Sequence, residues 1–246
     1  MSNIEELKRK LEEAKESLKV LDEDKQNLDA IFSKYTELPM SRKDMENVLL
    51  EHGRVVIDSL LSDPQLKFRE YTMLSQGLCN RSLLLFQAIL REIANENFIA
   101  TTSLLRSQCE TLAACCYVEE NPHNLESVLY GSRDAQAEIK SPNILTQIDH
   151  ADRKFKRLRL DYDQLSEVLH PNFLSHFSAA EIVSKDGVDI GIKLSLPGSL
   201  KKEDAVEMIK MAYMWTKWFL VTCRKMDAKC RPQRRSWGFA KKLFKG

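Results

Sequence analysis

The chain has 246 residues, of which 43% are hydrophobic, enough to fill the core of one large or two small domains. Its 37 basic and 36 acidic residues nearly cancel, so the average charge makes no case for binding to nucleic acid or a membrane. The charge is unevenly distributed, however. Residues 224–246 contain nine Lys or Arg and one Asp, a net of +8, which leaves −7 on the first 223 residues.

The cysteines and the apolar runs indicate a compartment. The six cysteines form no Cys-x2-Cys pair and several lie in apolar runs, so we expect reduced thiols. The charged, heptad-patterned N-terminus does not resemble a signal peptide. The most apolar run, residues 208–223, has 16 residues and two lysines, short of the ~20 apolar residues that cross a bilayer. We therefore expect a cytoplasmic protein.

Residues 1–37 are expected to form a coiled-coil helix. Apolar residues recur in alternating steps of three and four from Ile4 to Tyr35, whereas a helix packed on its own domain usually shows a wider stripe. The flanking charges divide by sign along this seam: Lys8, Lys10, Lys15, then Asp22, Asp24 and Asp29. A parallel pair would oppose like charges. The pattern thus predicts antiparallel pairing, either as a homodimer or against another helix of the same chain.

Residues 38–228 are expected to form one helical domain with a β-hairpin insertion. The eight Gly and seven Pro are few, and most runs between them have helical period, so the fold class is mainly α, a helical bundle. Ser41 followed by Asp44 predicts a helix start, Ser199 predicts another, and Gly77 indicates close packing or a break. Residues 180–196 alternate around an Asp-Gly pair, which predicts the hairpin. The expected helices span 41–63, 65–95, 98–118, 124–140, 143–158, 161–170, 172–180 and 200–228.

One predicted helix carries a candidate site. Residues 98–118 include only two charged side chains, Arg106 and Glu110, which are four apart on one face together with Tyr117. A helix with so few polar residues usually lies at the centre of a bundle. Both charged side chains should therefore be partly buried and paired. Arg before Glu is the weaker order for a pair within one helix, which favours a third partner from another helix.

The stretch "YDQLSEVLHPNF", residues 162–173, is the best source of that partner. Tyr162, Ser166 and His170 share a helical face, and Pro171 should end the helix at His170. The helix dipole favours the charged form of a histidine at this end, so His170 should titrate near neutrality, where a general acid or base works best.

Two interpretations of these residues remain open. In the first, Arg106, Glu110 and His170 form a catalytic site, with Tyr117, Tyr162 or Ser166 as ligand-binding neighbours. In the second, the same residues form a structural network that closes a helix end and fixes helix register.

The segments "RSQCE" and "YDQLSEVLHP" resemble motifs of a group of uncharacterised, mostly helical bacterial proteins, over roughly residues 70–180. Some helical bacterial defence and toxin proteins, the HEPN superfamily among them, use an Arg-x4-6-His ribonuclease motif. None of the five histidines here has an arginine five to seven residues before it, which puts HEPN-like cleavage in doubt. An Arg and a His from separate helices could still meet. The resemblance implies a role in bacterial defence.

Other catalytic motifs are missing from the sequence. No Cys/His cluster has zinc spacing, and no Walker A loop, GxGxxG or GxSxG motif occurs. Cys109, Cys115 and Cys116 share the Arg106 helix, but no neighbour in sequence activates them as nucleophiles. We therefore expect neither a metal nor a cofactor.

Residues 229–246 are expected to form a basic aromatic tail. Its candidate nucleic-acid-binding residues are Arg231, Arg234, Arg235, Trp237, Phe239, Lys241 and Lys242. Such a segment can follow phosphates while its rings stack on bases, or it can lie on an anionic membrane. It can also dock on an acidic protein surface or stay solvated. The sequence thus favours a binding or regulatory protein with an anionic partner; the alternative is a metal-independent ribonuclease.

Overall fold

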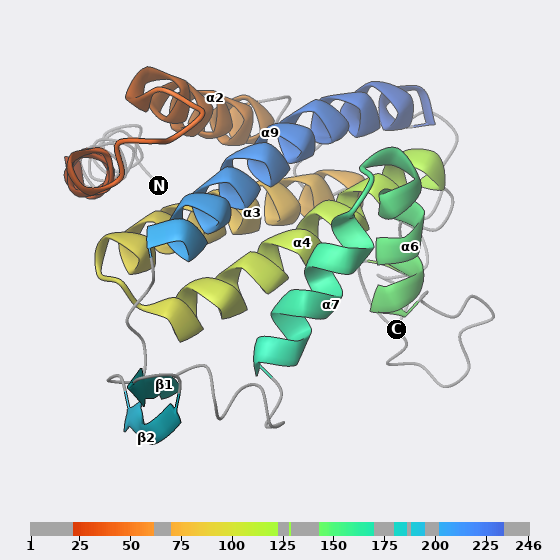
Figure 1. Ribbon diagram of the computed structural model, residues 1–246. Coiled ribbons are helices and arrows are strands. Elements are labelled where there is room, and N and C mark those ends of the chain that lie inside the picture. Colours follow the sequence, from red (N-terminus) through yellow and green to blue (C-terminus); the bar gives the residue numbers. More distant parts are fainter. Residues whose placement is uncertain are drawn as a thin grey trace, which may run out of the picture.

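Helix α4 (Phe98–Glu120) is the element against which most of the other helices pack (Figure 1). The computed structural model describes residues 22–61, 70–122, 128, 143–169, 180–185, 188–194 and 202–233. Within these ranges the protein is mainly helical, as the sequence predicts.

The other helices form layers on either side of α4. On one side lie α3 (Glu70–Ala94) and α9 (Lys202–Gln233), and α2 (Arg42–Leu61) covers the outer face of these two helices. On the other side lie α6 (Ile144–Lys154) and α7 (Leu158–Leu169). The candidate site is therefore at the boundary between α4 and its second layer.

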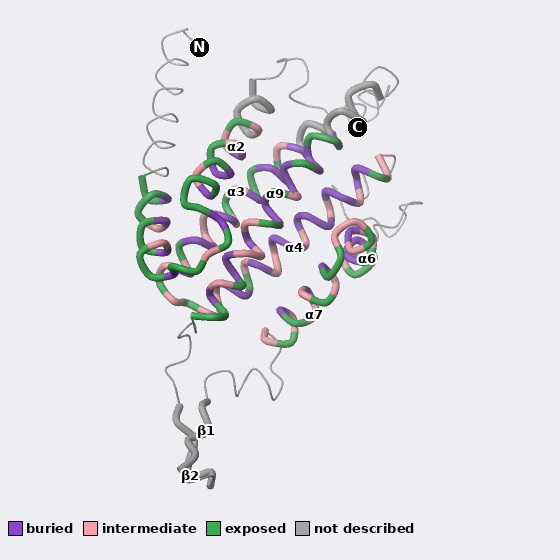
Figure 2. Tube along the Cα trace, turned by 45° about the horizontal axis from the view of Figure 1, so that its top comes forward, coloured by how far each residue is buried: buried purple, intermediate pink, exposed green. Residues whose placement is uncertain are grey.

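The composition of α4 explains its central place. Asn97 caps the helix by accepting a hydrogen bond from the backbone N–H of Ala100 at 3.2 Å. Within α4 only Ile99, Ser103 and Glu120 are exposed, so the helix is buried around nearly its whole circumference (Figure 2). The prediction of a central helix is confirmed.

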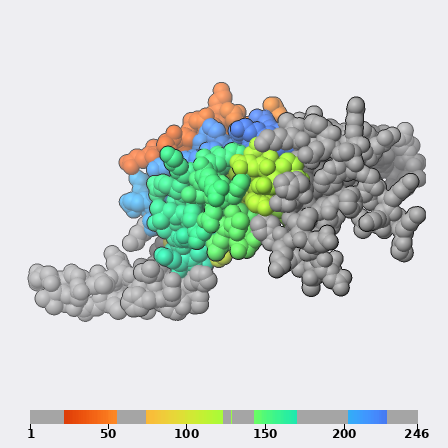
Figure 3. Space-filling model, turned by 90° about the vertical axis from the view of Figure 1, so that its right-hand side faces the viewer, coloured from red at the N-terminus to blue at the C-terminus, as the bar shows by residue number. Residues whose placement is uncertain are grey.

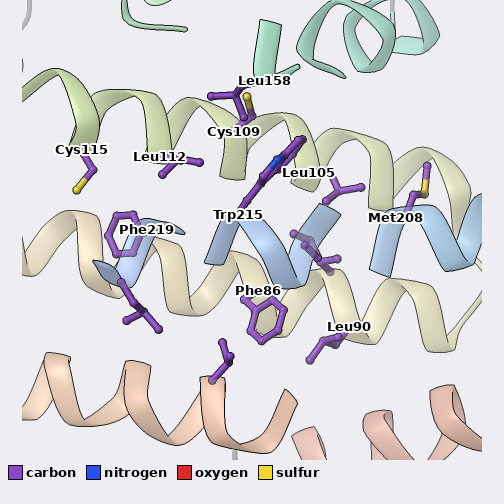
Figure 4. Packing of buried hydrophobic residues seen from close by; sticks show 14 of the residues in the cluster. Phe86, Leu90, Leu105, Cys109, Leu112, Cys115, Leu158, Met208, Trp215 and Phe219 are labelled. Carbon is purple, nitrogen blue, oxygen red and sulfur yellow. The ribbon is translucent and has the colours of Figure 1, made fainter. Parts of the chain in front are cut away.

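The core between α3, α4 and α9 is built on aromatic side chains. Trp215 and Phe219 of α9 lie between α3 and α4, and Phe86 comes from α3 (Figure 4). Leu105 and Leu112 of α4 complete this layer, and all five side chains are fully buried. Burial of such a side chain stabilises the fold by about 1.5–3 kcal/mol, so this layer holds the three helices together.

A reciprocal cap starts α2, as predicted. The backbone N–H of Asp44 donates to Ser41 Oγ at 3.2 Å, and the backbone N–H of Ser41 donates to Asp44 Oδ2 at 2.9 Å. The hydrogen bonds from Ser41 lower the pKa of Asp44, since they favour its charged form.

The helix at residues 22–34 packs against its own chain. Leu28, Ile31 and Tyr35 are buried in the main core, whereas Lys25, on the predicted seam, is exposed. Ile31 lies off that seam. In the described residues the buried stripe is therefore that of a helix packed on its own domain, and residues 1–21 lie outside the described part.

The acidic half of this helix also finds partners within the chain. Asp24 is buried and accepts a hydrogen bond from Gln87 Nε2 of α3 at 2.8 Å, while Asp29 pairs with Arg42. Burial raises the pKa of Asp24 despite this hydrogen bond. Asp24 therefore contacts another helix of its own chain, while pairing with a second copy stays a prediction.

A left-handed turn divides the helix predicted at 143–158. Helix α6 ends at Lys154, and Arg157 has φ 81° before α7 begins at Leu158. Asp152 accepts a hydrogen bond from the backbone N–H of Arg159 at 2.9 Å, which satisfies a free donor in the first turn of α7.

Other boundaries differ more simply. Gly77 marks neither a break nor close packing, because α3 is continuous there and an added Cβ would meet no atom within 4 Å. Helix α9 runs to Gln233, five residues beyond its predicted end at 228, so Arg231 is helical. The Ser199 cap and the helices predicted at 124–140 and 172–180 lie outside the described residues, except for two positions: residue 128 is helical, and residue 180 lies in a strand instead of a helix.

Two short strands follow α7 in the sequence. Strand β1 (Ala180–Lys185) pairs antiparallel with β2 (Val188–Leu194), with Ala180 opposite Leu194 and an irregularity between Val183 and Ser184. The residues of the predicted Asp-Gly turn, 186 and 187, lie outside the described part.

Among the described residues, none of the helices combines the length and apolar character needed for a transmembrane segment.

Candidate functional site

Tyr162 of α7 joins Arg106 and Glu110 of α4 in one polar cluster. The Tyr162 hydroxyl accepts hydrogen bonds from Arg106 Nη2 at 3.1 Å and Nε at 3.3 Å, and it donates to Glu110 Oε1 at 3.2 Å. Arg106 Nε lies 3.5 Å from Glu110 Oε1. The third partner that the weak Arg-before-Glu order indicated is thus Tyr162. We call these three residues the α4–α7 polar cluster.

Packing of α7 fixes the position of the Tyr162 ring. Leu158, Tyr162 and Leu165 are buried at helical spacing on the face of α7 that meets α4. The Arg106 guanidinium lies 5.2 Å from the ring centroid, so a cation–π contact adds to the hydrogen bonds. Figure 3 shows α6 and α7 side by side on this face, with part of α4 visible next to them.

Both charges of the cluster are partly buried. The side chains of Arg106 and Glu110 are 32% and 27% exposed, as expected for the only two charged residues in an apolar stretch. Each has an opposite charge and the Tyr162 hydroxyl as partners. Such a cluster can hold two helices in register, and its solvent-facing edge can still meet a polar ligand.

Two other predicted site residues lie apart from this cluster. Ser166 donates its hydroxyl hydrogen to the backbone carbonyl of Tyr162 at 2.7 Å, so it is satisfied within α7. Tyr117 lies further along α4, where its ring meets His150 of α6 edge-on at 5.6 Å. Within the described part, no hydrogen bond joins the Ser166 side chain to Arg106 or Glu110.

His170 lies outside the described residues, as do the tail residues beyond Gln233. Helix α7 ends at Leu169, seven residues after Tyr162, which is roughly 10 Å of helix.

The sequence did not indicate a second ionic contact, between α4 and α6. Glu119 is 5% exposed and accepts a hydrogen bond from Lys154 Nζ at 2.8 Å. Burial opposes the charge on Lys154, but the hydrogen bond to Glu119 and nearby negative charge outweigh it and raise the lysine pKa. Beside this pair, His150 Nε2 lies 2.7 Å from Glu120 Oε2. Glu119 and Glu120 were missed because the predicted helix ended at 118.

A buried histidine was also missed. His52 of α2 is fully buried and stacks on Phe219 with ring centroids 5.6 Å apart. Neither ring nitrogen has a hydrogen-bond partner of good geometry among the described residues. Desolvation by burial lowers the pKa of His52 to about 4, against an opposing contribution from the backbone of Cys79. The sequence could have indicated this burial, because His52 falls within the apolar stripe of α2.

Across the ranges that the structure describes, no three His, Cys, Asp or Glu side chains are grouped so that they could hold a metal ion.

Comparison with known proteins gives the chain no family. No protein-family model matches it, and neither does any curated protein or solved structure. The fold and the site define a mainly helical protein with a polar cluster between two of its helices.

Proposed function

We propose that the chain is a non-enzymatic binding or regulatory protein of the cytoplasm, with an anionic partner that its C-terminal tail contacts. The role in bacterial defence is carried over from the sequence resemblance. In this proposal the helical bundle, with its β-hairpin insertion at 180–196, is a scaffold for the two ends of the chain.

The observation that carries the proposal is the mutual pairing of Arg106, Glu110 and Tyr162. A catalytic arginine has to be available to a substrate's developing charge. Here the Arg106 guanidinium donates two hydrogen bonds to Tyr162 and lies beside a carboxylate. A satisfied cluster of this kind supports a structural role, which leaves recognition to other parts of the chain.

Self-association is proposed through residues 1–21, the part of the coiled-coil pattern that lies before the described helix. Leu28 and Tyr35 of the same seam are buried in the chain's own core, so they are not available to a second copy. For an antiparallel dimer, a cysteine at Lys10 should crosslink to one at position 24 of the other copy, which would require Asp24 to leave its contact with Gln87. Crosslinks from position 10 to position 10 would exclude this orientation.

The anionic partner is tested by measuring binding of the full chain to single-stranded RNA and to DNA at several salt concentrations. Five tail residues are replaced by Gln in one variant: Arg231, Arg234, Arg235, Lys241 and Lys242. A matched control replaces five exposed basic residues of the bundle: Lys43, Arg54, Arg81, Arg153 and Lys156. We expect affinity to fall steeply with salt and to be lost only in the tail variant, because released counterions drive such binding.

An equal loss of affinity in both variants would mean that the total positive charge of the protein, rather than the tail, determines binding. If neither nucleic acid binds, vesicles with increasing anionic lipid content separate a membrane partner from an acidic protein partner. Binding to vesicles would contradict the assignment to nucleic acid.

A metal-independent ribonuclease is the second candidate, with His170 as the acid or base, and Arg106 and Glu110 beside it. The observation that favours it is that Tyr162, on the helix that leads to His170, contacts both charged residues of α4. Incubation of mixed RNA and DNA with the wild type and with His170→Ala decides between the two proposals. We expect no cleavage by either protein. Cleavage by the wild type that His170→Ala abolishes, without loss of folding, would overturn the binding proposal.

A further inference from the structure

Cys79 of α3 and Cys223 of α9 lie side by side inside the bundle. Their Sγ atoms are 3.1 Å apart, although the residues are separated by 144 positions in the sequence. Both side chains are buried, at 0% and 2% exposure. The packing of α3 against α9 therefore holds two thiols in direct contact in the core.

A third thiol lies next to this pair. Cys115 of α4 extends toward α9 (Figure 4), and its hydrogen bond with Cys223, together with burial, raises its pKa well above the ordinary value. Cys223 is thus placed with a thiol neighbour on each of two helices. Cys115 is the competing partner in any reaction of Cys223.

The distance between Cys79 and Cys223 is close to that needed for a bond. The sulfur atoms of a protein disulfide are about 2.05 Å apart, so these two need to approach by only about 1 Å. Side-chain rotation and a small shift of one helix can supply such a movement. No separation of the helices is required.

We propose that Cys79 and Cys223 are a redox pair that closes to an intramolecular disulfide when the protein meets a peroxide. One thiol loses its proton, and its sulfur attacks a peroxide oxygen; the O–O bond breaks and leaves a sulfenic acid and, for hydrogen peroxide, water. The second thiol attacks the sulfenic sulfur, the S–S bond forms, and the hydroxyl leaves as a second water. The two sulfurs are oxidised by two electrons, and the peroxide is reduced by two.

Burial sets the behaviour of this pair. Because both thiols are shielded from water, the oxidant reaches them only when the bundle opens locally, so closure is slow in the folded protein. The finished bond would join α3 to α9 and constrain a loop of 144 residues in the unfolded chain. The oxidised protein is therefore the more stable form. The inference does not depend on the proposed function.

The test uses the full chain, treated with hydrogen peroxide under native conditions. Remaining thiols are then alkylated in denaturant, and the protein is digested without reductant for mass spectrometry. We expect one linked pair of peptides, containing Cys79 and Cys223, which dithiothreitol separates. We also expect the melting temperature to rise by roughly 10 °C on oxidation.

The variants isolate the pair. Cys109→Ala and Cys115→Ala should keep the link, since each leaves Cys79 and Cys223 in place. Cys79→Ala and Cys223→Ala should lose both the link and the rise in melting temperature, and circular dichroism reports whether they fold. If they do not fold, the peptide map of the wild type still decides.

Three results would overturn the proposal. In the first, all thiols remain unoxidised after prolonged treatment with hydrogen peroxide. In the second, the main disulfide joins Cys115 to Cys223. In the third, the folded protein gives the same mixture of disulfides as protein oxidised while unfolded in urea.

Discussion

The hydroxyl of Tyr162 donates a hydrogen bond to Glu110 Oε1 at 3.2 Å and so joins α7 to the central helix. The same oxygen accepts from Arg106, which means that one phenol oxygen serves both charges of α4. The Tyr162 hydroxyl therefore helps to fix the register between α4 and α7, together with the packing of Leu158 and Leu165.

Removal of that oxygen should destabilise the protein. We expect Tyr162→Phe to lower the free energy of unfolding by about 1–2 kcal/mol, because Arg106 and Glu110 each lose a partner in a half-buried position. Tyr213→Phe is the matched control, since in the described part of the chain the Tyr213 hydroxyl accepts only from the exposed Lys217, at 3.3 Å. This change should alter stability by less than about 0.5 kcal/mol. Urea unfolding measures both. Equal effects would show that the cluster does not stabilise the α4–α7 contact.

His52 should make the protein sensitive to acid. Its pKa is about 4 in the folded state against 6.5 ordinarily, so below pH 6.5 the unfolded chain takes up a proton that the folded chain does not. Stability should then fall as the pH drops from about 6.5 to 4, by about 3 kcal/mol in total. His52→Phe, which cannot be protonated, should lack this part of the fall.

Urea unfolding at a series of pH values measures the difference between wild type and His52→Phe. His150→Gln, at a histidine on the opposite side of the bundle core, should retain the fall due to His52. Parallel curves for wild type and His52→Phe would contradict the prediction.

Gln108 links three helices at the centre of the core, yet it leaves one polar atom without a partner. Its Nε2 donates to Ser82 Oγ at 2.9 Å and to Thr216 Oγ1 at 3.3 Å, while its Oε1 has no hydrogen-bond partner among the described residues. Gln108→Met keeps the volume and removes that buried oxygen, while the Ser82 and Thr216 hydroxyls lose one donor each and keep their own hydrogens to donate. We expect it to be neutral or stabilising.

Gln108→Ala is the contrasting variant. It should destabilise the protein by about 2–4 kcal/mol, because it leaves a cavity between α3, α4 and α9. Thermal and urea unfolding of both variants make the comparison. A loss in Gln108→Met as large as that in Gln108→Ala would show that the amide itself, rather than its volume, holds the helices.

Gly77 should be replaceable with a gain in stability. It is exposed in the interior of α3, and an added Cβ would meet nothing within 4 Å. Gly77→Ala should therefore raise the free energy of unfolding by about 1 kcal/mol, the difference in helix propensity between the two residues. Gly53 in α2 is only partly exposed, but an added Cβ there also meets nothing within 4 Å, so Gly53→Ala should behave alike. Destabilisation by either change, measured by thermal unfolding, would contradict this.

Local chemistry explains what the sequence predicted well. The scarcity of charge in residues 98–118 indicated a central helix, and the Arg106–Glu110 order indicated a partner on another helix; both follow from the cost of burying a charge. The reciprocal cap of Ser41 and Asp44 needs only neighbouring residues, so it too was predictable.

Long-range packing explains what was missed. A heptad pattern shows that a helix has an apolar face, but it does not tell whether another chain or the helix's own bundle covers that face. Asp24 was therefore assigned to a facing helix, while in the fold it lies against Gln87. The turn at Arg157 has no sequence signal either, because its positive φ is imposed on a residue that rarely adopts it.

The central position of α4 also has a consequence for synthesis. Gln108 meets Thr216 of α9 across 108 residues, so the face of α4 that carries Leu105 and Leu112 lacks the part of its cover that α9 supplies until α9 has been made. Translation adds about 5–20 residues per second, so roughly 5–20 s pass between synthesis of Gln108 and synthesis of Thr216. During this interval the nascent chain exposes apolar side chains that are fully buried in the finished protein. It is therefore at this stage that a chaperone would be of most use.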